Sequence, residues 1–283
     1  MTINLSKENK KGLIKGFCLK NIVPNINKSL KFFKKKQINY YNKSYGFFVN
    51  LIEFVLLIIL AFLPPIIYMV WIRNTEKYHR ERWISIFFCF IWGATIAVIA
   101  AIILELLLNL SLTPSIHNPN IMGLITVIII APVVEEFTKP LALRTKIVKR
   151  ELDELEDGLI YGAVAGLGFS ATENLFYGWS FLEESLIYFL ILISIRSVGA
   201  CLLHASATAW TGYGYGKYIM RNTTILRVIP YFLLAIFVHA LYNSLLSFEI
   251  FEAALGLITA LLLSLVTISL VRNKIKKLDE QNR

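Results

Sequence analysis

The sequence predicts an all-α fold, a polytopic bundle of seven (or eight) transmembrane helices, and two observations support it. Apolar residues make up 56% of the 283 residues and charged residues only 17%, whereas a typical soluble domain has roughly 45–50% and about 25%. Apolar stretches of about 20 residues, the length that crosses a bilayer as a helix, recur along the chain. These features exclude a disordered protein, a collagen-like fibre and an ordinary soluble enzyme.

Seven stretches have the required length. They cover residues 47-72, 83-108, 121-143, 157-178, 196-219, 225-247 and 250-271. A shorter apolar run, 182-195, joins directly onto the fifth stretch, and the combined run is too long for one straight crossing. We expect either a short re-entrant piece followed by a span or one long bent helix, and this is why the count is seven or eight.

The excess positive charge lies in an N-terminal arm, residues 1-45. The arm holds eleven lysines against one acidic residue, Glu8, and the other 238 residues hold equal numbers, 18 each, of basic and acidic groups. Its lysines alternate with Phe, Leu and Ile, which suits the surface of an anionic lipid bilayer, where each lysine contributes about 1 kcal/mol. A solvated tail is the alternative.

The remaining connections predict the orientation of the bundle. Basic residues gather in 73-82, in 144-157, around Arg221 and in the last residues, whereas the connections between these contain no Lys or Arg. Basic connections usually face the cytoplasm. The chain therefore divides into the arm, a helix bundle over 46-272 and a short basic cytoplasmic tail, 273-283.

This orientation conflicts with the position of the arm. Seven spans and a cytoplasmic C-terminus would leave the lysines on the opposite side, which the same rule disfavours. Either the stretch 47-72 is a hairpin broken at Pro64 and Pro65, or the arm is an exception.

Ionisable residues inside membrane spans are rare and costly, and each one suggests a functional site. Glu105 lies near the end of the second stretch, where we expect a structural or interfacial role. The other intramembrane polar residues form four clusters on the third to sixth stretches.

The first cluster is in the sequence APVVEEFTKP. Glu135 and Glu136 lie in an apolar run bracketed by Pro132 and Pro140, and Lys139 follows at i+4 and i+3. An ion pair along one helix face is sterically natural. Adjacent glutamates point about 100° apart on a helix, so we expect a pair with Lys139 to explain only one of them.

The second cluster lies in the glycine-rich stretch 157-178. Its glycines are Gly158, Gly162, Gly166 and Gly168. Glycines at four-residue spacing predict close helix packing in membranes, and Phe169, Glu173 and Asn174 follow them. A tight helix interface with a buried hydrogen bond is the alternative.

The third and fourth clusters each contain a histidine with a polar partner one turn later. His204 precedes Thr208, with Arg196 two turns before the histidine, and His239 precedes Asn243. A single helical histidine is usually a satisfied core residue. Here two of the four histidines lie deep in predicted spans with the same spacing, which favours a functional site.

The chemistry of these groups suits hydrolysis. Glutamate and histidine can activate a water, polarise a carbonyl and protonate a leaving amine. The same groups can hold a divalent metal through two histidines and a carboxylate, with Glu173, His204 and His239 as candidate ligands. The residues leave open whether the cofactor is Zn²⁺ or whether there is none.

Taken in order along the chain, the motifs resemble the PrsW family of intramembrane proteases, which is similar to the CAAX prenyl endopeptidases and to bacteriocin-processing or immunity proteins. The motifs are Glu135-Glu136-x-x-Lys139, Phe169-x-x-x-Glu173-Asn174, His204-x-x-x-Thr208 and His239-x-x-x-Asn243. The resemblance covers about residues 48-247. Each motif is weak alone, whereas four in order on successive predicted spans are specific.

The resemblance implies an intramembrane endopeptidase, glutamic-type or metal-dependent, in a bacterial plasma membrane. Its implied substrate is a membrane-anchored protein, with an anti-sigma factor as the first choice. It further implies that Glu135 activates water and that His239 and Asn243 stabilise the oxyanion. The prenyl endopeptidases have a histidine where this chain has Glu173, so the partner of the base stays open, and His204 is one candidate.

We expect the catalytic residues to converge on one polar cavity that opens toward one side of the bundle. The catalytic set is Glu135, Glu136, Glu173, His204, His239 and Asn243, and the supporting set is Lys139, Asn174, Arg196 and Thr208. The alternative is a transporter that relays protons or cations through the same groups, although the sequence lacks the repeated halves typical of transporters. A catalytically silent scaffold is a third interpretation, and no nucleic-acid partner is expected.

Overall fold

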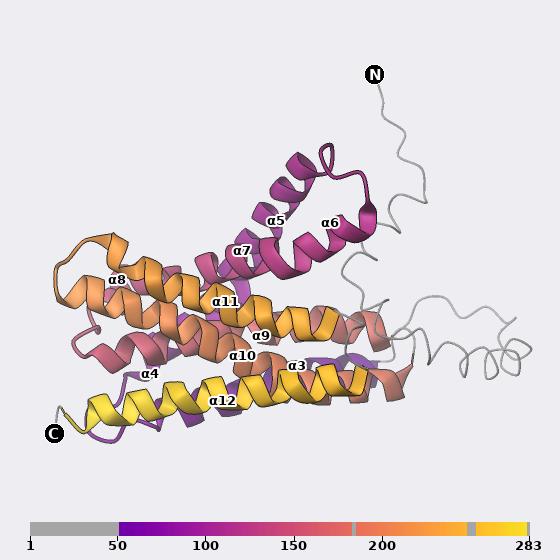
Figure 1. The fold of residues 1–283 in the computed structure, drawn as a ribbon. Helices are drawn as coiled ribbons and strands as arrows, with labels where there is room; N and C mark the ends of the chain where they lie inside the picture. Colours follow the sequence, from indigo (N-terminus) through magenta and orange to yellow (C-terminus); the bar gives the residue numbers. More distant parts are fainter. Residues whose placement is uncertain (1–50, 183–184, 248–252, 282–283) are drawn as a thin grey trace, which may run out of the picture.

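The computed structural model describes residues 51–182, 185–247 and 253–281, and within them all regular structure is helical, without strands. Within these residues, each of the seven predicted stretches is helical (Figure 1). The elements are α3 (Leu51–Arg73), α4 (Trp83–Trp92), η1 (Gly93–Ala97), α5 (Val98–Leu112), α6 (Pro119–Ile125), η2 (Thr126–Ile130), α7 (Ala131–Thr138), η3 (Lys139–Arg144), α8 (Lys146–Lys149), α9 (Leu155–Leu182), α10 (Leu186–Met220), η4 (Ile225–Val228), α11 (Ile229–Ser247) and α12 (Ala253–Asp279). The all-α prediction is confirmed.

Six of the helical stretches are long and apolar enough to cross a membrane, so the chain is a multi-pass membrane protein. The seventh, α9, has 28 residues, but its glycines and polar side chains lower its hydropathy. All of its residues from Glu156 to Ala171 are buried. A helix enclosed by other helices does not need a lipid-compatible surface, which explains why the predicted count of seven exceeds the six candidate spans.

Two alternatives left by the sequence are now decided. The run 182-195 leads into α10, which is one continuous helix of 35 residues, so the re-entrant piece is wrong. α3 continues through Pro64 and Pro65 as a single helix, so the hairpin is wrong as well. Proline is tolerated inside a membrane helix when neighbouring helices and local adjustments satisfy the freed backbone groups, and α3 packs along α9.

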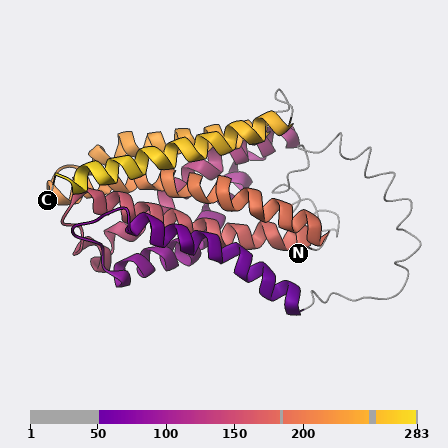
Figure 2. The ribbon, with the colours of Figure 1, turned by 90° about the horizontal axis from the view of Figure 1, so that it is seen from below.

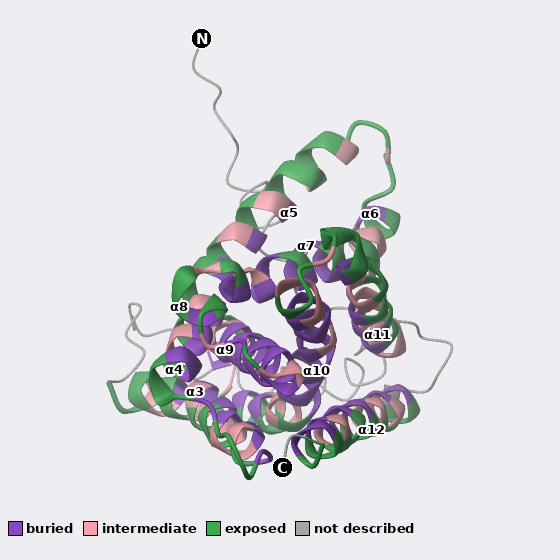
Figure 3. Ribbon diagram, turned by 90° about the vertical axis from the view of Figure 1, so that its left-hand side faces the viewer, coloured by how far each residue is buried: buried purple, intermediate pink, exposed green. Residues whose placement is uncertain are grey.

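The core of the bundle is the pair α9 and α10, which Figure 3 shows as the most continuously buried helices. Their backbones meet at glycines, as the glycine spacing predicted. A Cβ placed on Gly166 would lie 2.2 Å from the carbonyl oxygen of His204, and one on Gly162 would lie 2.5 Å from that of Thr208. The glycines therefore bring α9 directly against the part of α10 that carries the histidine motif.

The outer helices expose apolar side chains. Ile59 on α3, Ile103 on α5 and Val266 on α12 are all about half exposed. Figure 2 shows α12 along one side of the bundle and α3 along the other. Apolar faces of this extent are unfavourable in water, and they suit contact with lipid.

The basic connections meet at one end of the bundle, the end that carries α8 and the C-terminus in Figure 1. Arg82 Nη1 lies 3.2 Å from Glu151 Oε1, and the backbone nitrogen of Lys77 donates to Asp279 Oδ2 at 2.9 Å. Because α12 continues to Asp279, the predicted tail 273-283 is helical up to that residue. The arm 1-45 lies outside the described residues, and its contact with anionic lipid stays a prediction.

Candidate active site

The first predicted cluster lies where the helix type changes twice. Glu135 and Glu136 are on α7, which follows the π-helical segment η2, and Lys139 begins the 3-10 segment η3. Irregular helical turns of this kind are frequent at functional sites. All three side chains are buried: Glu136 and Lys139 are 0% exposed and Glu135 is 6% exposed.

Lys139 links three of the predicted residues. Its Nζ donates to Glu135 Oε2 and to Glu136 Oε1, both at 2.9 Å, and lies 2.8 Å from His204 Nδ1. The predicted ion pair is confirmed, but the expectation that it serves only one glutamate is wrong. Residues at i−3 and i−4 are both one turn away, so a single ammonium with three protons reaches both carboxylates and the imidazole.

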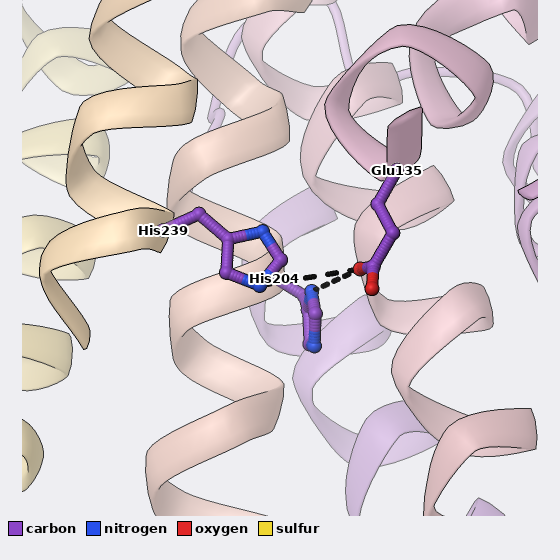
Figure 4. A group of neighbouring side chains, drawn as sticks. All are labelled: Glu135, His204 and His239. Carbon is purple, nitrogen blue, oxygen red and sulfur yellow. Dashed lines mark ion pairs between the residues drawn. The ribbon is translucent and has the colours of Figure 1, made fainter. Parts of the chain in front are cut away.

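Glu135, His204 and His239, on α7, α10 and α11, converge and are called the Glu–His triad below. Their ligand atoms all lie within 4.8 Å of one another. Glu135 Oε2 is 3.8 Å from His204 Nδ1 and 4.0 Å from His239 Nε2. The two imidazole rings meet edge to face with centroids 4.9 Å apart, and Figure 4 shows both of them directed at the Glu135 carboxylate.

Each histidine of the triad has a second carboxylate at its other ring nitrogen. His204 Nε2 lies 2.9 Å from Glu173 Oε2, and His239 Nδ1 lies 3.0 Å from Glu136 Oε1. Because an ionised carboxylate can only accept, these outer nitrogens carry the ring protons. The inner nitrogens then carry lone pairs on the side of Glu135, where that of His204 accepts a hydrogen bond from Lys139. An outer carboxylate of this kind fixes the tautomer and orientation of metal-binding histidines.

Glu173 is positioned by two of the supporting residues. Arg196 Nη2 donates to Glu173 Oε2 at 2.8 Å, and Arg196 Nε donates to Asn174 Oδ1 at 2.8 Å. The guanidinium also lies over the ring of Tyr177, 4.0 Å from its centroid. Arg196 and Asn174 thereby hold Glu173 against the outer nitrogen of His204.

The two adjacent glutamates have different surroundings. Glu136 receives hydrogen bonds from Lys139 and His239 at Oε1, and from Thr208 Oγ1 at Oε2 over 2.8 Å. The Glu135 carboxylate accepts a single hydrogen bond within the described part of the chain, from Lys139. Glu136 is therefore committed to protein partners, whereas Glu135 retains capacity for water or a metal.

Asn243 shares a face of α11 with His239, but its side-chain amide bonds to the backbone of η2 instead of to the triad. Its Nδ2 donates to the carbonyl oxygen of Val127 at 2.8 Å. Val127 lies in η2, where the π-helical pattern shifts the backbone ladder, and side chains from neighbouring helices commonly satisfy such carbonyls in membranes. Direct contacts therefore join five of the six predicted catalytic residues, and Asn243 is the exception.

The group that fits a metal differs from the predicted one in its carboxylate. The sequence suggested Glu173 with the two histidines, whereas the structure groups the histidines with Glu135. Glu173 is instead bound to Arg196 and to the proton-bearing nitrogen of His204. Helical spacing could not distinguish these carboxylates, because each lies on a different helix from the histidines.

The triad suits a zinc ion. Two imidazole lone pairs and a carboxylate oxygen form a common protein ligand set for Zn²⁺, which leaves a further position for water. The site has three carboxylates, those of Glu135, Glu136 and Glu173, and two cations, Lys139 and Arg196. With both histidines neutral, one formal negative charge remains, which also favours a bound cation.

One buried acid near the site was not among the predicted catalytic residues. Glu105 on α5 is 6% exposed and interacts electrostatically with Glu135 and Glu173. Asn109 Nδ2, one turn later, donates to the Glu105 carbonyl oxygen at 2.8 Å. The sequence feature that could have identified Glu105 is the amide residue Asn109 four positions later, the same spacing as that of His239 and Asn243.

A carboxylate and two histidines buried among membrane-spanning helices are the arrangement expected of a membrane-embedded hydrolase. Residues 81–271 match the family described as PrsW family intramembrane metalloprotease, and the chain belongs to that family. Protease PrsW of Clostridioides difficile (strain 630) is 29% identical to it over 197 residues, which cover 68% of this chain and 80% of that relative. No solved structure matches the chain.

Family membership confirms the resemblance seen in the motifs. The chain is an intramembrane protease, and it acts on membrane proteins. The transporter and the silent scaffold are therefore not retained.

Proposed function

We propose that the chain hydrolyses a peptide bond of a membrane-anchored protein at the Glu–His triad. The observation that supports this site most strongly is the approach of Glu135, His204 and His239 from three helices, with a carboxylate behind each imidazole. The family supplies the reaction class, and the triad supplies the groups that such a reaction needs.

Glu135 is the proposed general base. Its carboxylate accepts a proton from water while the water oxygen attacks the scissile carbonyl carbon. The protonated carboxyl then gives that proton to the amine nitrogen as the carbon–nitrogen bond breaks. Glu136 is less suited to this role, because three protein donors already occupy both of its carboxylate oxygens.

The triad also contains the proposed metal ligands, Glu135, His204 and His239. A Zn²⁺ ion bound there would polarise the scissile carbonyl and lower the pKa of a bound water. Glu173 and Glu136 orient the two imidazoles through their outer nitrogens. Glu135 would be a metal ligand in the zinc-dependent mechanism and is the base in the metal-free one, because it is the carboxylate that the inner nitrogens face.

We assign Asn243 a positioning role in place of the oxyanion role that the resemblance implied. Asn243 lies one helical turn after His239, and its amide holds α11 against η2 by donating to the Val127 carbonyl oxygen. This contact fixes the position of α11 along its axis relative to α7, and therefore the distance between His239 and Glu135.

We further propose seven spans, with α9 as the span enclosed by the others. The basic end of the bundle faces the cytoplasm by the positive-inside rule, and residue 51, at the start of α3, then lies on the opposite side. A bacterial plasma membrane is the proposed location, and an anti-sigma factor with one membrane span is the first substrate to test.

The decisive experiment is a cleavage assay in liposomes with a panel of single-span substrates, with and without a zinc chelator. We expect a specific cut in the wild-type reaction and none with either Glu135→Gln or His239→Ala. Cleavage by these variants at the wild-type rate would show that the reaction occurs elsewhere in the molecule.

A further inference from the structure

A second group of acidic residues lies at the basic end of the bundle, apart from the triad. Glu76 lies in the connection between α3 and α4, Glu154 immediately precedes α9, and Asp157 stands in the first turn of α9. Carboxylate oxygens from these three residues, called the acidic site below, all lie within 4.8 Å of one another. Glu76 belongs to a similar group with Glu156 and Asp279, so the end of α12 lies beside the same point.

The acidic site contains carboxylate oxygens that protein groups do not satisfy. Glu76 is 0% exposed, and its Oε1 has no hydrogen-bond partner among the described residues. The same is true of Oε2 of Glu154, which is half-buried. A buried oxygen that lacks a donor is costly, and each of these two neighbouring glutamates has one such oxygen, as a cation site would require.

Two of the three carboxylates are anchored by the backbone. Glu76 Oε2 accepts from the backbone nitrogen of Glu81 at 3.2 Å, and Asp157 Oδ2 accepts from that of Glu154 at 2.7 Å. These bonds fix the carboxylates of Glu76 and Asp157 in place. Two chain segments therefore build the site, the connection between α3 and α4 and the start of α9.

Basic residues are close, but their hydrogen bonds go elsewhere. Arg80 Nε donates to the carbonyl oxygen of Glu76 at 3.0 Å, and Arg73 Nε donates to that of Glu81 at 2.7 Å. In the parts of the chain that the structure describes, the ion pairs at this end are His79 with Glu154 and Arg82 with Glu151. The carboxylates of Glu76 and Asp157 thus lack a lysine or arginine partner there.

We propose that the acidic site binds a hard divalent cation through Glu76, Glu154 and Asp157. All of its donors are oxygens, which Mg²⁺, Mn²⁺ and Ca²⁺ prefer, whereas the nitrogen-containing triad suits Zn²⁺. A cation here joins the connection between α3 and α4 to the first turn of α9. Because α9 also carries Glu173, the ion stabilises the central helix from the end opposite to that residue.

The test measures binding of Mn²⁺ alone to the full-length, chelator-treated protein in detergent, by electron paramagnetic resonance and by thermal unfolding. We expect Mn²⁺ to bind and to raise the melting temperature of the wild type and of His239→Ala alike, because His239 belongs only to the triad. Glu76→Gln should bind Mn²⁺ at least about tenfold more weakly, since loss of even an outer partner of a metal site costs that much.

Glu151→Gln is the matched control, because Glu151 lies in the same region and pairs with Arg82 outside the acidic site. It should bind Mn²⁺ as the wild type does. If Glu76→Gln does not fold, Glu154→Gln replaces it, since a half-buried connecting residue tolerates the change. Equal Mn²⁺ affinity in wild type and the acidic-site variant, or binding lost in His239→Ala alone, would overturn the proposal.

Discussion

Lys139 Nζ lies 2.8 Å from His204 Nδ1 and 2.9 Å from Glu135 Oε2, so one buried ammonium touches two of the three ligand atoms of the triad. The ammonium places a positive charge where a bound metal ion would also place one. Lys139 and a metal ion would therefore compete for the same ligand atoms.

Lys139→Met should destabilise the protein and strengthen zinc binding. Removing one partner of a buried ion pair typically costs about 3–5 kcal/mol, and here it leaves Glu135 and Glu136 without their shared cation. Because a neighbouring positive charge is lost, added Zn²⁺ should raise the melting temperature of this variant more than that of the wild type. Equal zinc-dependent shifts in the two proteins would show that Lys139 and the metal do not share the site.

Glu135→Gln and Glu136→Gln should distinguish a glutamate that takes part in hydrolysis from one that mainly stabilises the protein. Glu135→Gln removes the proposed base, so we expect hydrolysis to fall by about 10²–10⁴-fold, with a moderate fall in melting temperature because Lys139 keeps Glu136 as its partner. Glu136→Gln places an amide group among three hydrogen-bond donors, so its melting temperature should fall the most. The opposite ranking would exchange the roles of the two glutamates.

Zinc content should depend on the outer carboxylate of His204. Glu173→Gln weakens the orientation of the imidazole, and such changes typically cost about 10–100-fold in metal affinity. Metal analysis and a zinc titration of the purified protein check this, with Glu151→Gln as the control variant. If Glu173→Gln binds Zn²⁺ as tightly as the wild type while cleavage is lost, then Glu173 acts on the substrate rather than on the metal site.

Gly166→Ala should disrupt the contact between α9 and α10. The added Cβ would lie 2.2 Å from the carbonyl oxygen of His204, and overpacking of this kind costs about 1–3 kcal/mol. Gly123→Ala on α6 is the matched control, because its Cβ would meet nothing within 4 Å; alanine in a helix is favoured there by up to about 1 kcal/mol. Thermal unfolding of both variants checks this, and similar melting temperatures would contradict the close packing.

The fold was largely predictable, because a membrane imposes simple length and hydropathy limits on each segment. The described part of each of the seven apolar stretches is helical. The span count differs at α9. Neighbouring helices enclose this helix, so its surface does not have to be apolar, and its mean hydropathy is too low for it to be counted among the candidate spans.

The sequence by itself determined which polar side chains share a helix face, because partners one turn apart on a helix appear at fixed spacing. An ion pair of Lys139 with one of the two glutamates was visible in this way, whereas its contact with both was found only in the structure. Only the tertiary structure decided that Glu135, and not Glu173, faces both histidines, and that Asn243 contacts Val127. These contacts depend on how helices far apart in the sequence are rotated and shifted along their axes relative to one another. Packing between the helices sets that arrangement, whereas residue spacing along one helix does not reveal it.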